Sequence, residues 1–475
     1  MIVPAEKNIS FSKELQQTLQ SRHLLRTELP FSDELIEWHI ENGYIAAQNS
    51  ISINKRGYQC NRCGQNDQRY FSFYPSSGKN QLYCRSCIMM GRVSEDVLLY
   101  SWVGEDEPNW QQIKLTWDGK LSSGQQKAAN VLIDTISKKG ELLIWAVCGA
   151  GKTEMLFPGI ESALNQGLRV CIATPRTDVV LELAPRLKAA FQCADISALY
   201  GGSDDKGCLS PLMISTTHQL LRYKGAFDVI IIDEVDAFPY SADQTLQFAV
   251  QKARKKSSTL VYVSATPSQE LKRKTLNGQL YSVRIPARHH QKPLPEPRFL
   301  WCGNWKKKLY RNKIPLAVKR WIEFHVKEGR PVFLFVPSVS VLEKAVACFK
   351  DVICRAAAVH AEDKHRKEKV QQFRDGQLDL LITTTILERG VTIPKVQTGV
   401  LGAESPIFTE SALVQIAGRT GRHKEHADGD VIFFHYGKTK SMLDARKHIK
   451  EMNALAAKKN EQTSHYLKTW YSILI

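Results

Sequence analysis

The feature that most constrains the fold of this chain is the stretch Gly149-Ala-Gly-Lys152-Thr153. The apolar run from Leu143 to Val147 precedes it and is typical of a buried strand, and a helical pattern follows it. Glycines let backbone N–H groups turn toward an anion, and a helix that starts there adds the positive end of its dipole. Lys152 can then reach the β- and γ-phosphates of a nucleotide, while the Thr153 hydroxyl holds Mg²⁺. The stretch predicts a phosphate loop within a strand–loop–helix unit.

The loop departs from the usual pattern at one position, because alanine stands at 146 where the motif has glycine. A glycine turn before an ordinary helix is therefore an alternative until other parts of the same site are found. One such part is a carboxylate for Mg²⁺ at the end of a nearby strand. Asp233 ends an apolar run, and Glu234 after it can orient and deprotonate an attacking water. An acidic strand end exposed to solvent is the alternative for this pair.

The balance of charge favours a polyanionic partner. The chain has 475 residues, with 65 Lys and Arg against 48 Asp and Glu, a net charge of +17 and a pI near 9.3. An excess of this size favours nucleic acid over a role in solubility alone. No stretch approaches the roughly 18 uncharged apolar residues of a membrane span, and no export signal is visible at the N-terminus. We expect a cytoplasmic protein of about three domains.

Short apolar runs that end in polar residues alternate with helical patterns from residue 121 onward, in two successive series. This alternation is typical of parallel sheets covered by helices, whose ligands bind at the carboxyl ends of the strands. We therefore predict an α/β fold with two tandem lobes. The expected parts are a helical segment (1–57), a zinc module (58–95), a connector that packs down (96–120), lobe 1 (121–290), a linker (291–304), lobe 2 (305–455) and a helical C-terminal tail (456–475).

Four of the eleven cysteines form two C-x-x-C pairs, Cys60 with Cys63 and Cys84 with Cys87. Each pair puts two thiolates on one tight turn, and two such turns complete a tetrahedral site for zinc. A redox dithiol needs a single pair, so a structural zinc site is the better interpretation. Four sulfur ligands leave no open position for water, which argues against catalysis by this metal.

The residues between the two cysteine pairs are rich in aromatic side chains and predict a β-hairpin that turns between Pro75 and Gly78. We expect most of these aromatic side chains to pack a small core. The alternative is that one face of the hairpin stacks nucleobases, with arginines nearby for phosphates. The aromatic residues are Tyr70, Phe71, Phe73, Tyr74 and Tyr83, and the arginines are Arg62, Arg69 and Arg85.

The second lobe contains a predicted helix on which Arg419 and Arg422 share one face. A guanidinium suits the charge that builds on a transferring γ-phosphoryl group, so an arginine finger from this lobe could complete the nucleotide site. A basic helix on the surface is the alternative. In the first lobe, the hydroxyls of Ser264 and Thr266 end the strand after the acidic one and can hydrogen-bond the acidic cluster.

Together these motifs resemble helicase superfamily 2, in register from about residue 121 to 435. The resemblance implies two RecA-like lobes and an ATPase that uses ATP and Mg²⁺. Nucleotide contacts would come from Gln125, Gly149, Ala150, Gly151, Lys152, Thr153, Asp233 and Gly390; catalysis from Lys152, Asp233, Glu234, Arg419 and Arg422; and Mg²⁺ ligands from Thr153 and Asp233. Strand contacts would come from Thr174, Pro175, Arg176, Thr216, Thr217, Pro337, Ser338 and Thr384, and coupling from Ser264, Thr266 and Gln415.

A four-cysteine module ahead of such a motor resembles the ComFA family of late-competence DNA-uptake ATPases of Gram-positive bacteria. That resemblance implies an ATP-driven single-stranded-DNA translocase at the inner face of the membrane. The implied partners are the uptake channel and the phosphoribosyltransferase-like competence protein ComFC, and the protein could be an oligomer. A helicase of replication restart or repair similar to PriA is the alternative, although PriA has its zinc region between the lobes. A non-catalytic DNA-binding scaffold is a third hypothesis.

Overall fold

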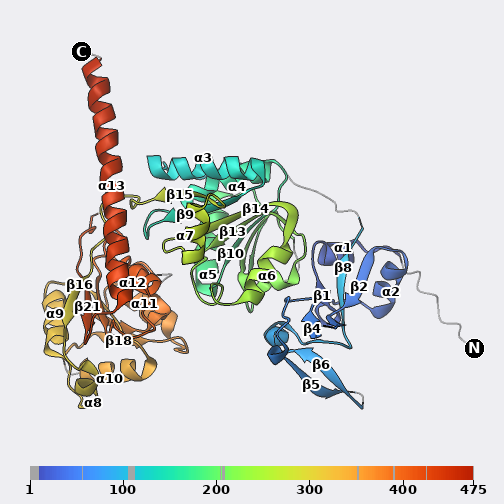
Figure 1. Cartoon of the computed structure of the whole chain (residues 1–475), viewed down its shortest axis with the longest axis horizontal. Helices are drawn as coiled ribbons and strands as arrows, with labels where there is room; N and C mark the ends of the chain where they lie inside the picture. Colours follow the sequence, from blue (N-terminus) through green and yellow to red (C-terminus); the bar gives the residue numbers. More distant parts are fainter. Residues whose placement is uncertain are drawn as a thin grey trace, which may run out of the picture.

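A computed structural model describes residues 10–55, 57–76, 78–104, 113–203, 205, 209–349, 352–388, 391–423 and 425–473, with side chains up to residue 458. The described residues form an N-terminal region, lobe 1 and lobe 2, in that order along the chain. Figure 1 shows lobe 1 in the middle, with the N-terminal region on one side of it and lobe 2 on the other.

The N-terminal region contains a three-stranded antiparallel sheet and a zinc module of short strands. The sheet has the order β1-β8-β2, and β5-β6-β7 and β3-β4 are the sheets of the zinc module. The elements are α1 (Lys13–Leu19), β1 (Leu24–Leu25), η1 (Arg26–Glu28), α2 (Asp33–Glu41), β2 (Ile45–Asn49), β3 (Ile51–Asn54), β4 (Gly57–Cys60), η2 (Gln68–Tyr70), β5 (Phe71–Ser76), β6 (Lys79–Cys84), η3 (Arg85–Met90), β7 (Val93–Ser94) and β8 (Leu98–Trp102).

This region differs from the expected helical segment, because strands β1 and β2 lie on either side of β8 in one sheet. Leu25 pairs with Leu99 and Ala47 pairs with Tyr100, so residues assigned to the connector complete the first sheet. β1 has only two residues and pairs with β8, which lies far along the chain, so this pairing leaves no local periodicity in the sequence. The expected hairpin is confirmed, with Phe71 opposite Cys84.

Lobe 1 is a parallel seven-stranded sheet with helices around it, in the order β11-β12-β10-β13-β14-β9-β15. Its centre is apolar: Ile172 of β10 lies opposite Ile214 of β12 and Ile231 of β13, and all three are buried. The elements are α3 (Ser123–Lys138), β9 (Glu141–Ala146), η4 (Glu154–Leu156), α4 (Phe157–Asn165), β10 (Val170–Thr174), α5 (Thr177–Ala190), β11 (Ile196–Leu199), β12 (Leu212–Thr216), η5 (Thr217–Arg222), β13 (Phe227–Asp233), α6 (Gln244–Ala253), β14 (Arg254–Ser264), α7 (Gln269–Leu276) and β15 (Tyr281–Ile285).

Lobe 2 has the same architecture as lobe 1, with a six-stranded parallel sheet in the order β16-β21-β20-β17-β19-β18. The first strand of this sheet, β16, falls in the segment we assigned to the linker. The elements are β16 (Arg298–Trp301), α8 (Trp305–Tyr310), α9 (Leu316–Lys327), β17 (Val332–Phe335), α10 (Val339–Phe349), β18 (Ala356–Val359), α11 (Arg366–Arg374), β19 (Leu380–Thr383), η6 (Thr385–Leu387), β20 (Gln397–Leu401), α12 (Glu410–Ala417), β21 (Val431–His435) and α13 (Lys440–Ile473).

The long helix α13 begins on lobe 2 and its far end stands away from the body of the protein (Figure 1). The helical tail expected from the sequence is therefore the end of a helix that starts on lobe 2. Among the described residues, no helix combines the length and the apolar character that a membrane span requires.

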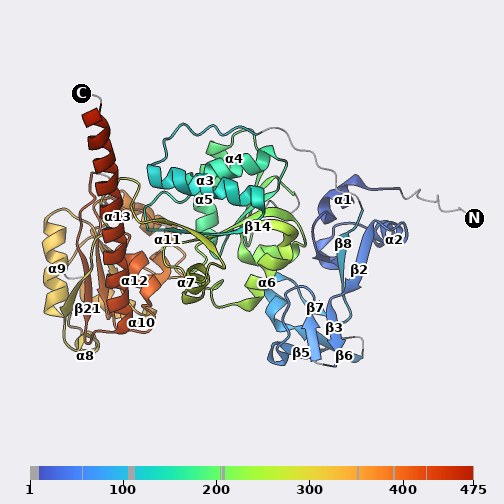
Figure 2. The same cartoon turned by 45° about the horizontal axis from the view of Figure 1, so that its top comes forward.

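The N-terminal region is attached to lobe 1 by buried charges. The carboxylate of Glu28 accepts hydrogen bonds from Arg62 of the zinc module and from Arg222 of η5, at 2.8 Å and 2.6 Å. Lys252, at the end of α6, donates to the carbonyl of Arg62 at 2.7 Å. Figure 2 shows α6 beside the zinc module. Because a buried charge without a partner is costly, this network fixes the zinc module against lobe 1.

Candidate functional site

The phosphate loop has the conformation that its glycines predict. Gly149 and Gly151 have φ angles of +79° and +70°, in the left-handed region that other residues rarely adopt. A Cβ atom at Gly151 would lie 2.3 Å from Nε2 of Gln125, which itself donates to the carbonyl of Ala150 at 3.0 Å. The loop is therefore closed against the glutamine at the start of α3. A 3₁₀ turn, η4, separates the loop from α4, so the regular helix begins later than the motif suggests.

The acidic cluster at the end of β13 is joined to the next strand and to lobe 2. Asp236 accepts hydrogen bonds from Ser264 at 2.6 Å and from Thr266 at 2.7 Å. It also accepts a bond from Ser411 at the start of α12, at 2.8 Å. The expected bonds of Ser264 and Thr266 to the acidic cluster are present, and Ser411 extends them across the two lobes. Sequence patterns gave no signal for Ser411.

The two arginines of lobe 2 lie beyond the helix on which we expected them. Helix α12 ends at Ala417 with Gly418 as its C-cap, and Gly421, with a φ of +68°, turns the chain after it. Arg419 is buried and donates to the carbonyls of Glu388 and Val391. Burial, together with the charge of the nearby Arg422, lowers the pKa of Arg419 to about 9.

Arg422 is in a different environment, since its side chain is only partly buried. It donates to the carbonyl of Gly418 at 3.0 Å and to the hydroxyl of Thr392 at 3.2 Å. Thr392 and Arg422 both line the nucleotide cavity, and Arg422 is the less buried of the two arginines, so it has more freedom to meet a phosphate. Gly390, expected among the nucleotide contacts, lies outside the described residues.

A cavity of about 700 Å³ brings most of the predicted nucleotide residues together between the lobes. The candidates that line it are Gln125, Gly149, Gly151, Lys152, Thr153, Asp233, Glu234, Gln415, Arg419 and Arg422. Lys152, Thr153 and Asp233 also share a smaller hollow below the loop. This arrangement suits a nucleotide whose phosphates lie at Lys152 and whose Mg²⁺ is held by Thr153 and Asp233.

Two residues that join the lobes near this cavity were missed, because the Pro- and Arg-rich stretch that contains them carries no nucleotide motif. Arg288 is buried and donates to the carbonyls of Thr420, at 2.9 Å, and of Gly421. The next residue, His289, donates its backbone N–H to the carbonyl of Gly149 at 3.0 Å. Burial lowers the pKa of Arg288 to about 10, so it stays charged at neutral pH. The stretch thus links the phosphate loop to the arginine segment. Its basic residues were the only signal in the sequence.

The predicted strand-contact residues lie at the carboxyl ends of four strands, β10, β12, β17 and β19. Thr174, Thr216 and Thr217 are buried, so these positions would present backbone groups rather than hydroxyls to a strand. Pro337 is partly buried, Ser338 is exposed and Thr384 is half-buried.

Arg176 joins the two sets of strand-contact residues. Its guanidinium donates to the carbonyl of Ile386 in lobe 2 at 2.7 Å. The segment after β10 and the segment after β19 therefore meet across the interface of the lobes, on the side of the sheets where a strand would bind.

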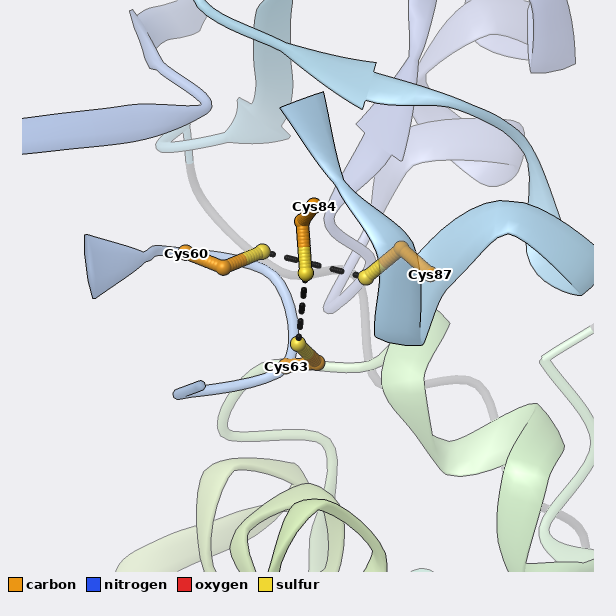
Figure 3. Close-up of side chains that lie close together, drawn as sticks. All are labelled: Cys60, Cys63, Cys84 and Cys87. Atoms are coloured by element: carbon orange, nitrogen blue, oxygen red, sulfur yellow. Dashed lines mark hydrogen bonds between the residues drawn. The ribbon is translucent and has the colours of Figure 1, made fainter. Parts of the chain in front are cut away.

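The four cysteines of the zinc module converge, as Figure 3 shows. Their sulfur atoms all lie within 4.8 Å of one another, and the pairs Cys60–Cys87 and Cys63–Cys84 are each 3.7 Å apart. Tetrahedral Zn²⁺ with bonds of about 2.3 Å needs sulfur atoms about 3.8 Å apart, so these residues fit the metal. All four are buried, which leaves the site closed to substrate.

The aromatic side chains of the zinc module are less buried than we expected. Phe71 is in the core, but Tyr70 and Phe73 are 48% and 56% exposed. Because side chains alternate along a strand, Phe73 lies on the same face of β5 as Phe71, and the core covers that face only at the Phe71 end of the strand. Arg62, which the alternative interpretation placed near phosphates, is fully buried in its ion pair with Glu28.

Family models match three successive parts of the chain. Residues 7–101 match the competence protein ComFA N-terminal domain, residues 118–269 match the type III restriction enzyme res subunit, and residues 314–424 match the helicase conserved C-terminal domain. Among solved structures, Dbp5 of S. cerevisiae bound to RNA and ADP BeF3 is similar over 70% of this chain and 88% of its own, with a TM-score of 0.53 and 15% identity. That likeness shows the fold of the two RecA-like lobes.

Curated relatives cover the N-terminal region and both lobes. Competence protein ComFA of Bacillus subtilis (strain 168) is 88% identical over 96% of this chain and 99% of its own length. Competence protein ComFA of Streptococcus pneumoniae (strain ATCC BAA-255 / R6) is 39% identical over 78% of this chain and 85% of its own. The two lobes and their motifs make this protein an ATP-hydrolysing, helicase-like enzyme that uses ATP and Mg²⁺ and binds nucleic acid. The chain belongs to the ComFA family of competence proteins.

Proposed function

We propose that the protein is an ATP-dependent single-stranded-DNA translocase that drives the uptake of transforming DNA. The observation that carries this proposal is the pairing of two inter-lobe contacts. One is the nucleotide cavity, which both lobes line. The other is the bond from Arg176 to Ile386, which joins the strand-contact segments of the two lobes. Because the same interface carries both, ATP binding and hydrolysis would move the two halves of the DNA track relative to each other.

The net charge and the similarity to ComFA proteins support DNA as the substrate. A net charge of +17 favours a phosphate backbone, and contacts to phosphates read no sequence, as a translocase requires. The relatives' printed name is competence protein ComFA, which supports a role in taking up DNA. We further propose that the protein works at the inner face of the membrane with the uptake channel and the phosphoribosyltransferase-like protein ComFC.

The proposed catalytic roles follow from the cavity. Lys152 and Thr153 bind the phosphates and Mg²⁺, Asp233 holds the metal, Glu234 positions and deprotonates water, and Arg422 reaches the γ-phosphoryl group. Ser264, Thr266 and Gln415 connect the acidic cluster and the phosphate loop to lobe 2. In the zinc module, Zn²⁺ held by the four cysteines would have a structural role, since no ligand position is left open.

The proposal is tested by ATP turnover with single-stranded DNA, duplex DNA and RNA compared side by side, and by displacement of streptavidin from a biotinylated single strand. We expect single-stranded DNA to stimulate most. Lys152→Ala and Glu234→Gln should lower turnover by about 100-fold or more, because each removes a group that acts in the transition state. Lys127→Ala, an exposed change on α3, is the matched control.

Three outcomes would overturn the proposal. Wild-type turnover in either active-site variant contradicts the roles of Lys152 and Glu234. Undetectable turnover with every nucleic acid favours the DNA-binding scaffold. Efficient strand separation of duplex DNA without streptavidin displacement favours a helicase of replication restart or repair.

A further inference from the structure

A groove of about 1050 Å³ separates the zinc module from lobe 1. Tyr70, Tyr83 and Arg85 of the zinc module line one wall, and Phe238 with the first residues of α6 lines the other. We call these four residues the aromatic groove. Its walls come from distant parts of the chain, so its shape depends on how the zinc module is attached to lobe 1.

The attachment of the zinc module holds the two walls at a fixed separation. The ring of Phe248 on α6 lies so close to Gly64 that a Cβ atom there would be 2.5 Å from the ring. Lys252, at the other end of the same helix, donates to the carbonyl of Arg62 in the zinc turn. Helix α6 therefore touches the zinc module at both positions, and the groove is a preformed feature of the fold.

The groove presents aromatic faces to solvent. Phe238 is 77% exposed and Tyr70 is 48% exposed. No described ring stacks on Phe238, so its faces are open within the part of the chain that the structure describes. A phenylalanine exposed to this degree loses the free energy that burial of a ring supplies. Flat, exposed aromatic faces in a groove are what nucleobases stack on.

One charged side chain in the groove is available to a phosphate backbone. Arg85 is exposed and has no ion-pair partner among the described residues. The two acids in the groove already have partners: Asp67 binds Arg69 at 2.6 Å, and Asp243 accepts from the backbone N–H of Thr245 at 2.8 Å as the N-cap of α6. Arg85 is thus the charge that remains available to a ligand, and it can bind phosphate or stack on a base.

The groove shares a helix with the predicted strand-contact residues of lobe 1. The segment Thr217–Arg222, which follows β12, packs on α6. Asp243, at the groove, is the N-cap of the same helix. Phe238 follows Glu234 by four residues, on the loop between β13 and α6. The groove and the strand-contact segment therefore both border α6.

We infer that the aromatic groove binds single-stranded DNA, stacking its bases on Phe238 and Tyr70 and its phosphates against Arg85. This inference rests on the proposed function and extends its DNA track onto the zinc module. The zinc module then acts on the substrate directly as one wall of the binding site. Because stacking needs only a planar base, the groove reads no sequence.

The test measures the affinity of the full-length protein for oligothymidylates of increasing length by fluorescence anisotropy. The variants are Phe238→Ala, Tyr70→Ala and Arg85→Ala. The matched control is Phe324→Ala, a phenylalanine that is 59% exposed on α9 of lobe 2. For the wild type, affinity should rise once the strand is long enough to reach the groove. Phe238→Ala and Tyr70→Ala should each lose about fivefold or more for long strands only, and Arg85→Ala should reduce the salt dependence by about one ion.

A second readout places the strand. A long oligonucleotide that carries 5-iododeoxyuridine should crosslink under ultraviolet light to peptides that contain Phe238 or Tyr70, and zinc content should match the wild type in every variant. Affinities equal to those of Phe324→Ala at all lengths, or crosslinks confined to the two lobes, would overturn the inference. Normal DNA binding with a loss of binding to a purified competence protein would assign the groove to a protein instead. If the proposed function itself were wrong, single-stranded DNA would fail to stimulate the wild type.

Discussion

Arg419 and Arg422 are three residues apart in the sequence but have different burial and different hydrogen-bond partners. Arg419 is buried and holds the backbone of lobe 2 through the carbonyls of Glu388 and Val391. Arg422 is bound more loosely at the mouth of the nucleotide cavity. Substitution of Arg419 should therefore affect mainly the stability of lobe 2, and substitution of Arg422 mainly catalysis.

Arg422→Ala should lower kcat by about a thousandfold while nucleotide affinity changes little, because an arginine finger acts on charge that develops in the transition state. Arg419→Ala should instead lower the stability of lobe 2 by about 1–3 kcal/mol, because it leaves buried carbonyls without donors. Single-turnover kinetics and thermal melting of both variants distinguish these effects. Full turnover in Arg422→Ala would assign the finger to another residue.

At the scale of elements, the turn between Cys60 and Cys63 is joined to η5 by one network of ion pairs. Arg62 lies between two zinc ligands and shares the carboxylate of Glu28 with Arg222, which ends the strand-contact segment. Zn²⁺ held by the four cysteines would therefore stabilise more than its own module. Removing it should disturb the position of a segment that we propose binds DNA.

A Cys84→Ser, Cys87→Ser double variant should lose its zinc, melt earlier in the N-terminal region and show weaker stimulation by single-stranded DNA. Metal analysis, melting curves and stimulated turnover measure the three effects. Cys354→Ser, which changes an exposed cysteine outside the cluster, is the control. Retention of metal at full stoichiometry would contradict the four-sulfur site.

The sequence predicted the elements that have their own local pattern. The apolar runs of both lobes became strands, from β9 (Glu141–Ala146) to β21 (Val431–His435), because continuous apolar runs favour central parallel strands. Pairing of β1 with β8 could not be predicted, since nothing local marks a two-residue strand. The end of α12 before Arg419 was missed because the helical spacing of the arginines outweighed Gly418 in our reading.

The candidate site likewise contains residues that the sequence predicted and residues that it did not. Lys152, Thr153, Asp233 and Glu234 were found because a nucleotide requires those residue types at the ends of strands. Arg288 was missed because its role comes from burial between two lobes, which no spacing in the chain encodes. Its neighbours in the sequence form no motif of a nucleotide site.

At the scale of the whole molecule, Arg288 and His289 connect the phosphate loop with the arginine segment. Arg288→Ala leaves the carbonyls of Thr420 and Gly421 without their donor, so the closed arrangement of the lobes should be less stable. We expect the apparent affinity for ATP to fall by about tenfold, with partial rescue by Arg288→Lys. Energy transfer between dyes on the two lobes should report less closure with a non-hydrolysable ATP analogue.

Arg320→Ala, an exposed change on α9, is the control for this variant. Closure and ATP affinity equal to the wild type in Arg288→Ala would show that the lobes are held by other contacts, such as the bond of Ser411 to Asp236.

The N-terminal region is fastened to lobe 1 and stands on the far side from lobe 2 (Figures 1 and 2). A partner that binds the N-terminal region would therefore immobilise lobe 1 and leave lobe 2 free to move. In a translocase, the gripped half is the stator and the other half is the lever arm. Each cycle then pulls on the strand instead of rotating the enzyme, and the point of anchorage decides which lobe delivers the force.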